Sequence, residues 1–176
     1  LQAAGLAATK GRTWRPLLDT ARDAQHTYAA RDEGASWRRG VDFYDEGVML
    51  WLEVDAWIRE ETKGARSLDD FCRAFFGPPS GPAEVRPYDR AELVAALNAV
   101  APRDWEAFFH ARVDALRPDP PVEGLEAAGW KLVYSAKAND FSEAYAEEED
   151  APLDVRFSLG LVLSSEGLVV DVVPGS

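Results

Sequence analysis

The sequence predicts a mainly α-helical protein that ends in a short β region. Apolar residues recur at helical spacing through most of the chain up to residue 116, whereas β-branched residues gather after residue 152. The 176 residues are 47% hydrophobic and 28% charged, which is enough apolar material to bury a core. We therefore expect a helical bundle followed by a strand, a short helix and a β-hairpin.

The first predicted helix covers residues 16–30. Pro16 suits the first helical position, because its fixed φ angle matches the helix and its missing amide proton is not needed there. Apolar side chains then follow at helical spacing: Leu17, Ala21, Ala24 and Tyr28. Residues 31–40 are polar and contain Gly34 and Gly40, so we expect a connector there.

The strongest helical pattern covers residues 41–62, and Gly64 follows it as a C-terminal stop. Helical spacing groups one set of side chains on a side that we expect to be buried: Tyr44, Val48, Trp51, Leu52, Asp55 and Ile58. A second set widens this apolar surface: Leu50, Val54 and Trp57. Charged side chains are expected mainly on other parts of the helix: Glu53, Arg59, Glu60 and Glu61.

Three further helices have recognisable starts. Ser67 begins one as an N-cap, with Asp70 in its first turn, and Phe71, Ala74, Phe75 and Phe76 supply its apolar face. Asp89 and Glu92 form a capping box at the start of the next. Pro102 is expected to open the last, whose inward side chains are Trp105, Phe108, Phe109, Val113 and Leu116.

The composition changes after the proline-rich break at 117–121. Alternation predicts a strand at 130–134, and an acidic segment at 141–149 predicts a short helix. Residues 155–163 and 168–173 are β-rich and are separated by a turn-like segment. We therefore expect three parts: a helical region at 1–126, a connecting strand and helix at 127–151, and a hairpin at 152–176.

Composition also excludes several functions. The formal charge of −12 and pI of about 4.6 disfavour nucleic acid and an anionic membrane as partners. Cys72 is the only cysteine, and His26 and His110 are the only histidines, so neither H-E-x-x-H nor a cysteine-rich zinc site is present. We expect no metal ligand in this chain, a buried Cys72, and histidines with surface or structural roles.

Tyr44 is the one candidate for a chemical role that the residues themselves indicate. It stands at the start of the helix predicted at 41–62, with the small residue Gly47 one turn later. A phenol presented there can donate a hydrogen bond to a developing oxyanion. It can equally serve as a structural hydrogen-bonding group, and spacing alone leaves both interpretations open.

Several motifs together resemble the glycyl aminopeptidase family of zinc metallopeptidases. They are SWRRGVDFYDEG at 36–47, LWLEVD at 50–55, SLDDF at 67–71, VAALN at 94–98 and GWKLVY at 129–134. The resemblance extends from Gly11 to Ser176. It implies that 1–126 corresponds to the C-terminal helical half of a thermolysin-like catalytic domain, and that 152–176 corresponds to the beginning of a PDZ domain. The zinc ligands of the family are expected before Leu1, so zinc would be a cofactor of the intact enzyme and this chain alone would be inactive.

The resemblance also implies site residues. Tyr44, in a Tyr-x-x-Gly pattern, is similar to the tyrosine with which related aminopeptidases stabilise the tetrahedral oxyanion. Ser158, Leu159, Gly160 and Leu161 resemble the loop with which a PDZ domain receives a peptide carboxylate. A two-stranded hairpin is marginal in water, so we expect it to pack on the helical region, to self-associate with another copy, or to move.

The resulting functional prediction is a part of a zinc aminopeptidase for peptides with N-terminal glycine or another small residue. The chain would supply a cleft wall and the Tyr44 phenol, and its partner would be the peptide substrate. The alternative is a non-catalytic helical interaction module with a peptide-binding β tail. A third hypothesis, an acidic carbohydrate-active protein, has only the abundance of carboxylates in its favour. Both the cytoplasm and the periplasm of a bacterium remain open as compartments.

Overall fold

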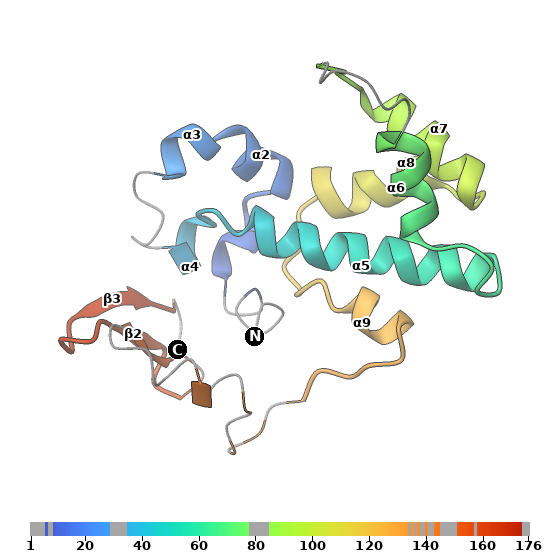
Figure 1. The fold of residues 1–176 in the computed structure, drawn as a ribbon. Coiled ribbons are helices and arrows are strands. Elements are labelled where there is room, and N and C mark those ends of the chain that lie inside the picture. The colour runs from blue at the N-terminus through green and yellow to red at the C-terminus, as the bar shows by residue number, and fades with distance from the viewer. Residues whose placement is uncertain are drawn as a thin grey trace.

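The computed structural model describes residues 6, 9–28, 35–77, 85–133, 135, 137, 140, 143–144, 151–156 and 158–173. It is mainly helical with a small antiparallel sheet near the C-terminus, as the sequence predicts (Figure 1). The helices are η1 (Lys10–Thr13), α2 (Leu17–Arg22), α3 (Ala24–Thr27), α4 (Ala35–Arg38), α5 (Phe43–Glu61), α6 (Leu68–Phe76), α7 (Arg90–Val100), α8 (Trp105–Phe109), the π-helical η3 (His110–Asp114) and α9 (Glu123–Ala127).

Helix α5 runs through the middle of the helical part. Figure 1 shows α2 to α4 near its first turns, α6 to α8 near its last turns, and α9 alongside it. The helix is terminated by Lys63 and Gly64, which both adopt positive φ angles. The prediction of a long helix at 41–62 is therefore confirmed to within two residues at each end.

The main core lies between one side of α5 and the helices α6, α7 and α8. Its buried members are Leu50, Val54, Ile58, Phe71, Leu97, Val100, Ala101, Trp105, Phe108 and Phe109. Trp105 is almost completely buried, so its indole N–H needs a hydrogen-bond partner inside the protein. It donates to the carbonyl of Ala101 at 2.9 Å. Burial of each large apolar side chain contributes about 1.5–3 kcal/mol, so this cluster is the main stabilising unit of the helical part.

Two predicted caps are confirmed. The amide of Glu92 donates to the Asp89 carboxylate at 2.9 Å, and the amide of Asp89 donates to Glu92 at 3.0 Å. At the start of α6, the amide of Ser67 donates to Asp70 at 2.8 Å. These reciprocal bonds satisfy backbone groups that a helix end otherwise leaves without partners.

Helix α9, which the sequence analysis missed, packs closely on α5. A Cβ atom added to Gly124 would lie 2.7 Å from the backbone nitrogen of Glu53, so only glycine allows this approach. A smaller cluster of Leu6 and Met49, with Val122, Leu125 and Leu132 against it, covers the same side of α5. Five-residue α9 has a weak sequence signal of its own, and tertiary packing stabilises it.

Several predicted helix boundaries are wrong. The helix predicted at 16–30 is interrupted at Asp23, and Ala21 and Tyr28 are exposed. Part of the expected connector is the short helix α4. Pro102 does not open α8, because Asp104 is its N-cap and accepts from the amide of Ala107 at 2.9 Å. The carboxylate of an N-cap residue accepts from backbone amides of the first helical turn, whereas the side chain of proline has no acceptor atom.

The C-terminal part is an antiparallel sheet with the order β1 (Leu153–Val155), β2 (Leu161–Leu163) and β3 (Val169–Val172). The predicted hairpin corresponds to β2 and β3, and the additional strand β1 pairs Val155 with Leu161. The strand predicted at 130–134 is wrong for 130–133, which form no strand and expose Trp130 and Val133. Of the helix predicted at 141–149, only residues 143–144 are described, and they are helical.

Candidate functional site

An open apolar groove of about 820 Å³ lies between α5 and α6. Its lining combines the first half of α5, one side of α6 and the segment before α7: Phe43, Tyr44, Gly47, Val48, Trp51, Leu52, Asp55, Arg59, Leu68, Asp69, Phe71, Cys72, Phe76 and Tyr88. Most of these side chains are apolar, and several are exposed. A groove of this size and lining can accept a peptide side chain or another apolar group.

The groove corrects the predicted orientation of α5. Tyr44 and Val48, expected in the core, are 61% and 53% exposed, whereas Glu46 and Glu53 are each only 2% exposed. Ile58 is buried as predicted. The first half of the predicted apolar side therefore faces the groove, and the core takes the neighbouring side of the helix.

Helix α6 supplies the opposite wall of the groove. Phe71 stacks on Trp51 of α5 with ring centroids 5.6 Å apart, and this contact forms the floor. Cys72 is exposed in the groove, so the prediction that it is buried is wrong. Phe76, expected on the apolar face of α6, is 63% exposed at the groove. Helix α6 thus divides its aromatic side chains between the core and the groove.

A paired charge closes one end of the groove. Asp55 accepts from the amide of Leu68 at 2.8 Å, which connects α5 to the first turn of α6. The second oxygen of Asp55 accepts from Arg59 at 2.7 Å. The bond from the Leu68 amide therefore links the two walls at this end of the groove, while the bond from Arg59 stays within α5.

Tyr44 lies at the other end, in the first turn of α5. Its ring contacts that of Phe43 with a centroid distance of 4.8 Å, and its hydroxyl forms a hydrogen bond with the hydroxyl of Tyr28. The exposed phenol can therefore reach a molecule in the groove while keeping a hydrogen-bonding partner in the protein.

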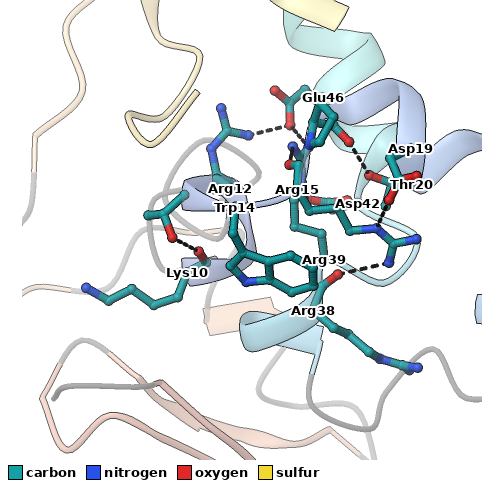
Figure 2. Close-up of polar contacts among 12 residues, drawn as sticks. Lys10, Arg12, Trp14, Arg15, Asp19, Thr20, Arg38, Arg39, Asp42 and Glu46 are labelled. Atoms are coloured by element: carbon teal, nitrogen blue, oxygen red, sulfur yellow. Dashed lines mark hydrogen bonds and ion pairs between the residues drawn. The ribbon is translucent and has the colours of Figure 1, made fainter. Parts of the chain in front are cut away.

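A buried ionic cluster, formed by Arg12, Arg39, Asp42 and Glu46, supports this first turn of α5. Figure 2 shows Arg12 and Arg39 converging on the same carboxylate oxygen of Glu46. Arg39 also donates to Asp42 at 2.9 Å and to the carbonyl of Arg15 at 2.9 Å. The cluster joins Arg12 of η1, which is 34 residues from Glu46, to the neighbouring residues after α4 and at the start of α5.

Burial affects ionisation within this ionic cluster. It raises the pKa of Asp42, and the charge and hydrogen bond of Arg39 only partly offset this rise. Burial also lowers the pKa of Arg12, against the opposing effect of Glu46. The directions agree with the cost of removing a charge from water, which the ion pairs compensate in part.

A second buried carboxylate, Glu53, connects α5 to η3. Arg112 binds it in a bidentate manner, with distances of 2.8 and 2.6 Å to the two oxygens. Glu123 of α9 accepts from Arg117 and lies 3.6 Å from Arg112. Helical spacing predicts Glu53 away from the apolar side of the helix, and no local signal identifies a partner that is 59 residues away.

The described residues offer no evident metal site. In the ranges given above, no three histidine, cysteine, aspartate or glutamate side chains are arranged to hold a metal ion. His26 and His110 are both exposed.

Among the described helices, none is both long and apolar enough to cross a membrane.

The four predicted peptide-binding residues lie in the turn before β2 and at its first residue, and none of them lines the groove. Ser158 and Leu159 form the turn between β1 and β2, Gly160 has a φ angle of 70°, and Leu161 begins β2. The amides of Ser158 and Leu159 donate to the carbonyl of Val155 at 3.1 and 2.8 Å. These two donors stabilise the turn, so they are engaged within the protein.

Comparison with known proteins adds no family assignment. No protein-family model matches the chain, and no curated protein matches it.

Proposed function

We propose that this chain forms part of a zinc aminopeptidase for peptides with N-terminal glycine or another small residue. In this proposal, residues 1–126 are the C-terminal half of the catalytic domain and residues 152–176 begin a PDZ domain. The chain supplies one wall of the substrate cleft and the phenol of Tyr44. Zinc ligands and their chemistry belong to the remainder of the intact enzyme.

One observation carries the proposal: an exposed tyrosine at the start of a central helix, at the end of an open apolar groove. When a peptide carbonyl carbon is attacked, its oxygen gains negative charge. A phenolic O–H that points to this oxygen stabilises the charge more in the transition state than in the substrate. Tyr44 has the donor and the exposure for this role, and the resemblance assigns the role to the same residue.

The test is Tyr44→Phe in the intact enzyme, with a glycyl p-nitroanilide as substrate. The substitution removes the hydroxyl and keeps the ring, so we expect kcat/KM to fall about 10²- to 10³-fold, as for other oxyanion donors. Trp130→Phe is a control, because Trp130 is an exposed aromatic residue outside the groove lining. Near-normal turnover by Tyr44→Phe would show that the phenol does not act in catalysis.

A non-catalytic interaction module is the second candidate, and the apolar groove favours it because exposed apolar surfaces often bind partners. The same assay separates the two functions. If the intact protein carries H-E-x-x-H and hydrolyses the glycyl substrate in a zinc-dependent manner, the aminopeptidase proposal holds. If it lacks the motif and does not hydrolyse the substrate, the interaction module is the better interpretation.

A further inference from the structure

Tyr28 is the hydrogen-bonding partner of Tyr44, and the sequence did not predict this contact. Tyr28 directly follows α3, and its hydroxyl forms a hydrogen bond with the hydroxyl of Tyr44. The two rings meet edge to face, with centroids 6.4 Å apart and an interplanar angle of 77°. Tyr28 also contacts Phe43 edge to face at 6.3 Å. The two phenols thus form a unit beside the groove.

The segment that carries Tyr28 is fixed to the helix that carries Tyr44. Arg15 binds Asp19 and Asp23, each at 2.7 Å, and these residues precede α3. The carbonyl of Arg15 accepts from Arg39, which also binds Glu46 two residues after Tyr44 (Figure 2). Arg15 and Arg39 therefore link the segment before α3 to the first turns of α5, close in sequence to both phenols.

The number of available protons determines which of the two hydroxyls donates in the hydrogen bond between them. Each phenol has one proton to donate, and its oxygen can accept hydrogen bonds. When Tyr44 donates its proton toward a substrate oxygen, Tyr28 has to be the donor in the bond between the two hydroxyls. A hydrogen bond received by the Tyr44 oxygen polarises its O–H and makes it a stronger donor.

We propose that Tyr28 is a positioning residue for Tyr44. It holds the exposed phenol of Tyr44 in one orientation and donates to its oxygen while Tyr44 donates to the developing oxyanion. This inference rests on the proposed function, because it assigns to Tyr28 an effect that acts only through Tyr44. It limits the rotamers of a side chain that otherwise has 61% of its surface exposed to solvent.

The experiment is a double-mutant cycle in the intact enzyme, with Tyr28→Phe, Tyr44→Phe and the double variant. Tyr28→Phe keeps the ring that contacts Phe43 and removes only the hydroxyl. The loss of one hydrogen bond corresponds to about a three- to tenfold decrease in kcat. We expect KM to change less than about twofold, and we expect Tyr28→Phe to have no further effect when Tyr44 is already Phe.

The outcomes separate this inference from the proposed function. Normal turnover by Tyr44→Phe overturns the proposed function, and with it the role of Tyr28. A large loss with Tyr44→Phe but none with Tyr28→Phe overturns the inference alone. Equal effects of Tyr28→Phe in both backgrounds would also overturn it, because Tyr28 would then act independently of Tyr44. Thermal unfolding of each variant, measured in parallel, identifies any loss that comes from misfolding.

Discussion

The two sides of α5 show how differently one helix can use its residues. The buried side contains two glutamates, Glu46 and Glu53, whose charges are paired with arginines from distant segments. The groove side contains Tyr44 and Val48, which are exposed although they are aromatic or aliphatic. Burial on this helix therefore depends on the available partners as well as on the hydrophobicity of the residue, since Leu50, Val54 and Ile58 are buried too. The difference indicates that the buried side serves stability and that the groove side is available for binding.

The largest stability effect is expected from removing a buried charge. Glu46→Ala leaves Arg12 and Arg39 without the carboxylate that they share, so the free energy of unfolding should fall by about 3–5 kcal/mol. Glu61→Gln, an exposed position on the same helix, should change it by less than about 0.5 kcal/mol. Chemical denaturation of both variants measures the difference. Similar values for the two variants would mean that the ionic cluster does not stabilise this side.

The aliphatic residues of the two sides give the next comparison. Ile58 has no exposed surface, and Ile58→Ala should cost about 2–5 kcal/mol because it leaves a cavity in the core. Val48→Ala removes a half-exposed side chain from the groove and should cost less than about 1 kcal/mol. Thermal unfolding midpoints rank the two variants. A larger loss for Val48→Ala would contradict the assignment of the groove as an open surface.

The same substitution, glycine to alanine, can be compared at the buried side of α5 and at its groove side. Gly124→Ala introduces a Cβ atom 2.7 Å from the backbone of Glu53, so α9 has to move and stability should fall by about 1–3 kcal/mol. A Cβ atom at Gly47, within α5 at the groove, meets nothing within 4 Å. Gly47→Ala should therefore stabilise the helix by about 0.5–1 kcal/mol. Denaturant unfolding measures the change in the free energy of unfolding for each variant. Changes of opposite sign would support the difference between the two sides, and changes of the same sign would contradict it.

The smallest expected effect is a dependence on pH. Burial raises the native pKa of Asp42 above its ordinary value of 3.8, and Arg39 only partly offsets this. The native state then binds the proton more tightly, so the contribution of Asp42 to stability falls as pH rises from 3.8 through the native pKa. Measured against Asp42→Asn, the free energy of unfolding of the wild-type chain should therefore rise as pH is lowered through this range.

Asp114 provides the control with the opposite sign. The hydrogen bond from Arg90 lowers the pKa of Asp114 below 3.8, and burial opposes this shift without cancelling it. Its contribution to stability is present above pH 3.8 and is lost as pH falls through the lower native pKa. Unfolding free energies of Asp114→Asn and Asp42→Asn, measured over the same pH range, should therefore diverge from the wild type in opposite directions.

Part of this fold was predictable because its causes are local. The capping box at Asp89 and Glu92 lies within one turn, and the long apolar pattern of α5 needs no information from elsewhere. The hairpin of β2 and β3 likewise follows from two β-rich segments with a turn between them. Short elements such as α9 and β1 were missed, because their own residues do not favour a structure strongly enough without tertiary contacts.

Of the residues that line the groove, the sequence indicated a functional role for only one, Tyr44. The sequence singled out Tyr44, but it did not indicate the groove around it, the exposure of Cys72 or the pairing with Tyr28. Tyr28 and Tyr44 are separated by a segment whose path cannot be read from periodicity. Contacts of this kind appear only when distant segments are brought together.

The amino-acid sequence alone determined that α5 exists, where it begins and ends, and that a helical region precedes a β hairpin. Only the tertiary structure decided which side of α5 is buried. Helical periodicity offers several apolar directions, and it cannot show that Arg12 of η1 and Arg112 of η3, 34 and 59 residues away, pair with Glu46 and Glu53. These arginines compensate part of the cost of burying Glu46 and Glu53, and Tyr44 lies on the other side of the helix, at the groove.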